Sequence, residues 1–123
     1  MKRQVSTDAA PAPGGAYSQA IVTGNLVFLA GQGPFVPSGE KVDGSFADEA
    51  RQTFENLRAV AEAAGCSLAG AVRVGVYLRD MANFATMNEI YGEFFPEPLP
   101  ARTTIQSDLP GFEIEVDAVV SLE

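Results

Sequence analysis

Few residue types in this chain can do chemistry, because it contains no histidine and only one cysteine. Without histidine, the Ser-His-Asp and Cys-His arrangements and the usual zinc sites are excluded. Cys66 has no partner for a disulfide and no histidine to activate it, so we expect an inert thiol. Any reaction must therefore use carboxylates, arginine, tyrosine, hydroxyls, backbone groups and water.

Arg102 is the first candidate, because it begins a strand-like run at 101–108 in a chain with 8 Lys+Arg against 16 Asp+Glu. A planar guanidinium can hold a small carboxylate through two parallel hydrogen bonds. The alternative is a surface or interface ion pair with Glu115 or Asp117. Sequence spacing does not decide between the two interpretations.

Glu115 and Asp117 are the candidate bases, since both lie on one face of the strand-like run at 113–122. A carboxylate on a rigid strand can orient and deprotonate water if burial or a nearby anion raises its pKa. The alternative is a solvated row of acidic side chains.

Three further polar positions are weaker candidates. Tyr17, in the loop GGAYSQA, has a ring that could cover a pocket or simply fill space. Residues 30–34, AGQGP, lack the lysine and the spacing of a nucleotide-binding loop. Asn88 faces either a groove or water, and the residues alone favour water.

Composition excludes several classes of partner. The net charge of −8 argues against nucleic acid and anionic membranes. The run LVFLA at 26–30 is too short to cross a bilayer, and residues 1–20 lack the apolar core of a secretory signal. We therefore expect one cytoplasmic domain over residues 1–123.

The hydrophobic pattern predicts an α+β fold with helices on one face of a mixed sheet. The predicted strands are 3–7, a hairpin at 19–33, 71–80, and a final pair at 101–108 and 113–122. Helices are predicted from a capping box at Ser45 to a stop at Gly65, and over 83–95. The opposite sheet face, with Tyr77 and Val119, should favour self-association.

Periodicity also predicts which side chains enter the core. Strand 71–80 should bury Val72, Val74, Val76 and Leu78. Helix 83–95 should bury Phe84, and the last strand should bury Leu122 with its other even-numbered residues.

Four segments in order resemble the Rid (YjgF) family of reactive-intermediate deaminases over essentially the whole chain. The segments are APAPGGAYSQA at 10–20, LVFLAGQGP at 26–34, LRDMANFATMNEIYGEFF at 78–95 and PARTTIQSDLPGFEIEVDAVV at 100–120. The resemblance implies a chorismate-mutase-like α+β fold of about six strands and two helices. It also implies a homotrimer whose sheets form a barrel, with clefts between subunits and no metal or organic cofactor.

The resemblance implies hydrolysis of small-molecule 2-imino acids, such as 2-iminobutanoate and 2-iminopropanoate, to 2-oxo acids and ammonia, which removes reactive metabolites. By the same resemblance, Arg102 binds the substrate carboxylate and Tyr17 is an aromatic lid. Gly31 is a pocket glycine, and Asn88 approaches the cleft from a helix.

Three positions depart from the family pattern. Asp117 matches an acidic position usually filled by glutamate that orients water, and its shorter side chain affects rate or substrate choice. Thr104 replaces a frequent cysteine at a position that uses its backbone carbonyl, and Ala30 replaces a frequent serine. A non-catalytic trimer that binds small carboxylates or a partner protein is the alternative.

Overall fold

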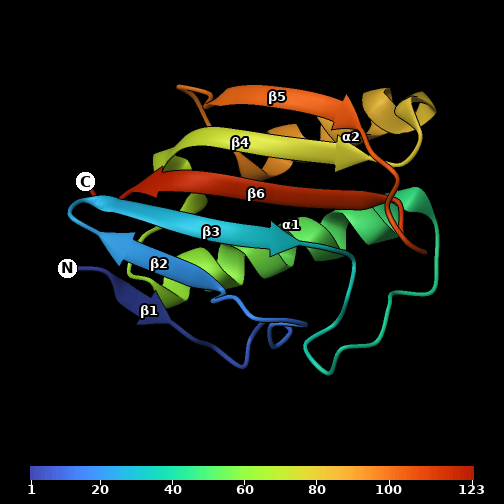
Figure 1. Cartoon of the computed structure of the whole chain (residues 1–123). Helices are drawn as coiled ribbons and strands as arrows, with labels where there is room; N and C mark the ends of the chain where they lie inside the picture. Colours follow the sequence, from blue (N-terminus) through green and yellow to red (C-terminus); the bar gives the residue numbers. More distant parts are fainter.

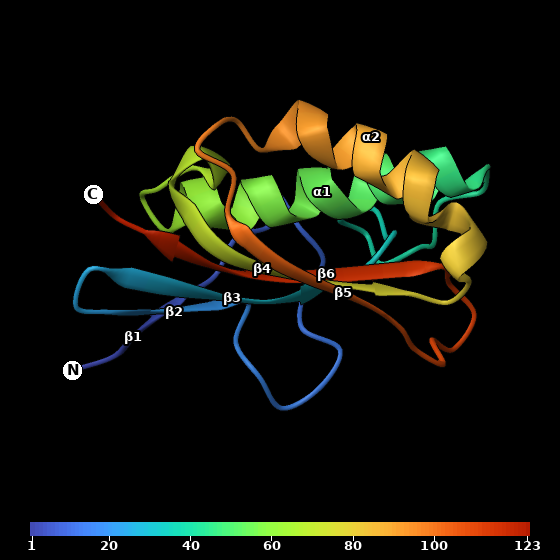
Figure 2. The ribbon, with the colours of Figure 1, turned by 90° about the horizontal axis from the view of Figure 1, so that it is seen from above.

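The computed structural model describes residues 1–123 as one mixed six-stranded sheet with two helices on one face (Figures 1 and 2). This confirms the predicted α+β class and the order of the elements. The elements are β1 (Arg3–Val5), β2 (Ala20–Thr23), β3 (Leu26–Gln32), α1 (Phe46–Ala63), β4 (Ala71–Leu78), α2 (Phe84–Phe94), β5 (Ala101–Gln106) and β6 (Ile114–Ser121).

The strands lie in the order β1-β2-β3-β6-β4-β5, and only β4 and β5 are parallel. The predicted pairing of the last two strands is therefore wrong: β5 pairs with β4, and β6 lies between β3 and β4. The reason is that α2 returns the chain to the starting end of β4, so the next strand runs parallel to it. As a result β5 forms one edge of the sheet.

Helix α1 begins and ends where the sequence predicts. The Ser45 hydroxyl accepts a hydrogen bond from the Asp48 amide at 3.2 Å, and the Asp48 carboxylate accepts one from the Ser45 amide at 3.0 Å. Gly65, just past the helix, has a φ of +90°, a conformation that favours glycine. The buried face of α1 packs across the sheet. Together with the apolar face of α2 and the sheet residues that these helices cover, it forms the core.

Three predicted core residues are exposed instead. The register of β4 against β6 shifts between Ala71 and Arg73, so Ala71 takes the buried place and Val72 is 47% exposed. Leu122 follows the last residue of β6 and is 37% exposed. Phe84, 36% exposed, begins α2 beside the sheet edge, where its ring faces Arg102.

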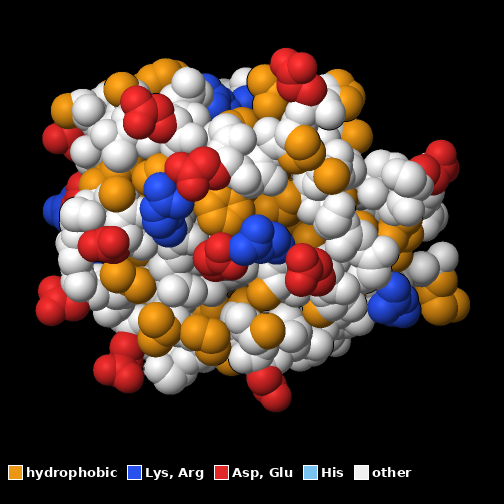
Figure 3. Space-filling model, turned by 180° about the vertical axis from the view of Figure 1, so that it is seen from behind, with side chains coloured by type: hydrophobic (Ala, Val, Ile, Leu, Met, Phe, Trp, Pro, Cys, Tyr) orange, Lys and Arg blue, Asp and Glu red, His pale blue; other side chains and the backbone are white.

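Charge is dispersed on the side of the molecule where the helices cover the sheet. In Figure 3 the Lys and Arg side chains are isolated spots among Asp and Glu, without a basic stripe. No helix is long and apolar enough to cross a membrane.

Candidate functional site

Arg102 lies on the helix side of β5 and is held by one face of α2. It pairs in register with Val74, a core residue, which fixes the direction of its side chain. Its Nη1 donates a 2.8 Å hydrogen bond to Oδ1 of Asn88. Its guanidinium carbon lies 4.6 Å from the ring centre of Tyr91 and 5.5 Å from that of Phe84. The spacing of 84, 88 and 91 places all three side chains on one helical face.

Arg102 has no carboxylate partner in the chain, because the four ion pairs of the molecule use other cations. They are Lys41–Glu49, Arg51–Glu93, Arg58–Glu55 and Arg79–Glu113. A guanidinium has five N–H donors, and this one has a single hydrogen-bond partner, Asn88. The open alternative, an ion pair with Glu115 or Asp117, is not formed within the chain.

A cavity of about 390 Å³ opens beside this guanidinium, and we call it the arginine pocket. Its lining residues are Asn88, Tyr91, Gly92, Leu99, Pro100 and Arg102. Tyr91 is buried, its hydroxyl has no hydrogen-bond partner, and burial raises its pKa. Thr104, two residues along the same face of β5, also has a buried hydroxyl without a partner. The predicted residues Arg102, Asn88 and Thr104 therefore share one region.

Tyr17 and Gly31 line a second cavity of about 390 Å³, together with Glu115. We call it the acid pocket. The Glu115 side chain lies against Gly31, where an added Cβ would come within 2.5 Å of Glu115 Oε2. Any side chain at position 31 would displace the carboxylate. Burial, and secondarily the charge of Asp117, raises the pKa of Glu115.

The loop between β1 and β2, which carries Tyr17, lies on the side of the sheet away from the helices (Figure 2). The Tyr17 hydroxyl accepts a 3.1 Å hydrogen bond from the Gly14 amide. Gln19, 2% exposed, holds the base of this loop: its Oε1 accepts from the Thr7 amide at 2.7 Å, and its Nε2 donates to the Pro11 carbonyl at 2.8 Å. The sequence interpretation missed Gln19, and its only signal was a polar residue directly before a β-rich run.

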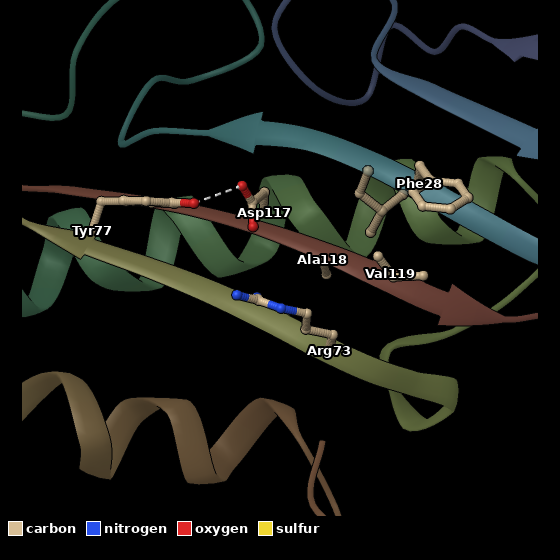
Figure 4. A pocket seen from close by; sticks show the side chains of 7 residues that line it. Phe28, Arg73, Tyr77, Asp117, Ala118 and Val119 are labelled. Atoms are coloured by element: carbon tan, nitrogen blue, oxygen red, sulfur yellow. Dashed lines mark hydrogen bonds between the residues drawn. The ribbon is translucent and has the colours of Figure 1, made fainter. Parts of the chain in front are cut away.

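Asp117 does not join the acid pocket. It lines a separate cavity of about 280 Å³ on the sheet face opposite the helices, with Phe28, Arg73, Tyr77 and Val119 (Figure 4). Its Oδ2 accepts a 3.1 Å hydrogen bond from the Tyr77 hydroxyl. Burial, together with this carboxylate, raises the pKa of Tyr77. The structure thus brings Glu115, rather than Asp117, to Tyr17 and Gly31.

The arginine pocket and the acid pocket lie on opposite faces of the sheet. Glu115 on β6 pairs in register with Tyr77 on β4, and Tyr77 pairs with Ile105 on β5. Arg102 is three residues before Ile105, so it lies two strands from Glu115 and three residues away along the strand. At about 3.3 Å per residue and 4.8 Å per strand, that is roughly 10 Å in each direction. One chain cannot bring both groups to the same small molecule.

No cluster of three or more His, Cys, Asp or Glu side chains has the arrangement of a metal site. The groups available in the arginine pocket and the acid pocket are the guanidinium of Arg102, the half-buried carboxylate of Glu115 with its raised pKa, and hydroxyls. They can bind an organic anion and accept a proton from water.

Comparison with known proteins gives consistent matches over the whole chain. The family model described as Endoribonuclease L-PSP matches residues 7–122. A RutC family protein of Pyrococcus horikoshii is 48% identical, with 100% of both chains covered. A 2-iminobutanoate/2-iminopropanoate deaminase of Dermatophagoides farinae is 42% identical over 99% of this chain and 98% of that one. The crystal structure of RidA from the Antarctic bacterium Psychrobacter sp. PAMC 21119 superposes with a TM-score of 0.91 at 39% identity, covering 97% and 98% of the two chains.

Proposed function

Because this chain belongs to the YjgF/Rid family, whose model matches nearly its whole length, we propose that it is a hydrolytic deaminase of reactive 2-imino and enamino acids. The products are 2-oxo acids and ammonia. The relative that carries this activity in its name covers almost the entire chain at 42% identity. Removal of reactive metabolites in the cytoplasm is the role that we assign to it.

The observation that carries the proposal is the unpaired Arg102. In a protein of net charge −8, a guanidinium without a carboxylate partner is held by Asn88 and two aromatic rings at the edge of a cavity. This arrangement fixes the plane of the guanidinium and leaves donors for the carboxylate of a 2-imino acid. We therefore assign Arg102, at the start of β5, to the substrate carboxylate.

Glu115 is the better supported base, in place of Asp117. Its raised pKa makes it a stronger proton acceptor than an ordinary carboxylate, and Tyr17 and Gly31 line the same pocket. In the reaction, water adds to C2 of the iminium while Glu115 takes a proton from it. Glu115 returns that proton to the nitrogen of the carbinolamine. The C–N bond then breaks with its electrons on nitrogen while Glu115 takes the proton of the carbinolamine hydroxyl, and ammonia and the 2-oxo acid result.

Two protomers are needed to complete this site, since the two pockets face opposite sides of one sheet. We propose the homotrimer of the family resemblance, in which β5 of one protomer brings Arg102 to the acid pocket of its neighbour. The edge position of β5 and the exposed Phe28 and Ile105 on the face opposite the helices support such contacts. The Thr104 backbone would then stand beside the imine nitrogen.

A second candidate is a non-catalytic trimer that binds small carboxylates. It is favoured by the separation of the arginine pocket from Glu115, because that pocket alone has the donors to bind an organic acid. An endoribonuclease is disfavoured by the net charge of −8 and the dispersed cations.

A coupled assay tests the proposal. Imines are generated in situ from alanine or 2-aminobutanoate by an amino-acid oxidase, and release of the 2-oxo acid is followed. Wild type should accelerate release, and Arg102→Ala should abolish the acceleration, because the carboxylate loses its bidentate partner. Arg79→Ala is the matched control, since that exposed arginine pairs with Glu113 outside both pockets.

Circular dichroism and light scattering should show Arg102→Ala folded and in the wild-type oligomeric state. Equal rates for Arg102→Ala and wild type would remove Arg102 from the mechanism. Binding of 2-oxobutanoate by a wild-type protein that shows no acceleration would support the carboxylate-binding alternative.

A further inference from the structure

Two phenylalanines form one wall of the acid pocket. The rings of Phe35 and Phe112 meet edge to face, with centres 5.3 Å apart and planes at 72°. The two rings fit here because residue 33 is glycine: an added Cβ would lie 2.9 Å from Phe35 Cε2 and 3.5 Å from Phe112 Cε2. Position 33 must therefore stay without a side chain for the pair to keep this geometry.

Buried polar groups of α1 fix the backbone of this wall. Asn56, 1% exposed, donates to the carbonyl of Phe35 at 2.6 Å and to that of Gly33 at 3.1 Å. Glu49, also buried, accepts a 3.0 Å hydrogen bond from the amide of Glu113, next to Phe112. The backbone that carries the two rings is thus fixed before any ligand binds, which lowers the entropic cost of binding against them.

The other residues that line the acid pocket are apolar or uncharged, except Glu115. Tyr17 adds a third ring, Pro11 and Pro13 add apolar surface, and Glu115 is the only charged side chain. The volume of about 390 Å³ exceeds the roughly 150 Å³ that holds a benzene molecule in an engineered protein cavity. The pocket has room for an aromatic ring as well as for the reacting carbon beside Glu115.

We propose that the acid pocket takes the substrate's own side chain and selects 2-imino acids with aromatic or large apolar side chains over 2-iminopropanoate. This inference rests on the proposed deaminase function. A ring entering the pocket meets Phe35, Phe112 and Tyr17, whose edges and faces favour aromatic contacts. A methyl group offers these rings much less apolar surface than a phenyl ring does, and a single methylene in an apolar pocket already changes kcat/KM by about 10-fold or more.

The test compares kcat/KM for two imines made in situ, 2-imino-3-phenylpropanoate from phenylalanine and 2-iminopropanoate from alanine. Wild type should favour the phenyl substrate by at least about tenfold. Phe35→Val and Phe112→Val should each lower that ratio several-fold. Phe46→Leu is the matched control, because Phe46 packs partly buried at the start of α1 outside both pockets and should leave the ratio unchanged.

A variant-free measurement covers the case in which a wall variant does not fold. Calorimetry on wild type should show tighter binding of 3-phenyl-2-oxopropanoate than of 2-oxopropanoate, again by about tenfold. A wild type that prefers 2-iminopropanoate, or wall variants with an unchanged ratio, would overturn this inference and leave the proposed function intact. A wild type that accelerates neither imine would overturn both.

Discussion

Glu115 and Asp117 lie two residues apart on the same face of β6, yet they meet different surroundings. Each carboxylate occupies space left by a glycine on a neighbouring strand, Gly31 on β3 and Gly75 on β4. Asp117 is bound by the Tyr77 hydroxyl, whereas Glu115 accepts no hydrogen bond in the chain and faces the acid pocket. The charge of Asp117 contributes to the raised pKa of Glu115, so we assign it the role of a positioning and tuning group.

Asp117→Asn should shift the acid limb of the pH profile of kcat/KM to lower pH. A negative Asp117 favours the protonated form of Glu115, so a neutral amide lowers the pKa of Glu115 toward its ordinary value. More Glu115 is then ionised at a given acidic pH, and the base stays active farther down the scale. Steady-state kinetics between pH 4 and pH 8 measure the midpoint.

Asp108→Asn is the matched control, because Asp108 is an exposed acidic residue outside both pockets. Its profile should overlay that of wild type. An acid limb that stays in place, or moves to higher pH, in Asp117→Asn would contradict the coupling between the two carboxylates.

At the scale of a single element, helix α2 has two functions. Its face with residues 84, 88 and 91 holds Arg102, and its other side packs on the core. Tyr91 serves both purposes: its ring lies under the guanidinium and stacks on Phe95, with ring centres 4.4 Å apart. The buried hydroxyl of Tyr91 has no partner, and such a group costs stability. The ring and the hydroxyl can therefore be tested separately.

Tyr91→Phe should raise the free energy of unfolding by about 1 kcal/mol, because it removes an unpaired buried hydroxyl and keeps the ring. Its KM for imines should match that of wild type. Tyr91→Leu removes the nearer of the two rings that contact Arg102 and should raise KM on the order of tenfold. Denaturant unfolding and steady-state kinetics give both quantities, and equal impairment of the two variants would show that the hydroxyl, rather than the ring, acts on Arg102.

At the scale of the whole molecule, the two pockets face opposite sides of the sheet, so the proposed site requires an assembly of protomers. Within one chain, Arg102 and Glu115 are separated by two strands and by the thickness of the sheet. A ring of identical protomers can bring the arginine pocket of one to the acid pocket of the next, since a head-to-tail contact joins different surfaces.

Mixing two inactive variants tests this arrangement. Arg102→Ala and Glu115→Gln should each be inactive, but co-folded in equal amounts they should recover roughly one quarter of wild-type activity, because a random head-to-tail contact joins the two intact halves in one case of four. Light scattering should show trimers in all samples. A mixture that remains inactive, although mixed trimers have formed, would place both residues in the same protomer's site.

The sequence by itself determined the local features of this protein. The capping box at Ser45, the stop at Gly65 and the period-2 and period-3.6 patterns fixed the order and type of the elements, because each depends on residues within a few positions of one another. The absence of histidine and the acidic balance limited the possible chemistry. The proposal that Arg102 binds the substrate came from its place in the chain and from family resemblance.

Only the tertiary structure decided which carboxylate meets Gly31 and Tyr17. Residues two apart on a strand share a face, so Glu115 and Asp117 could not be separated by periodicity. The register of β3 against β6 shifts between Leu29 and Gln32, and that shift places Gly31 against Glu115. A register between strands more than 80 residues apart depends on packing of the whole sheet, as does the pairing of β5 with β4.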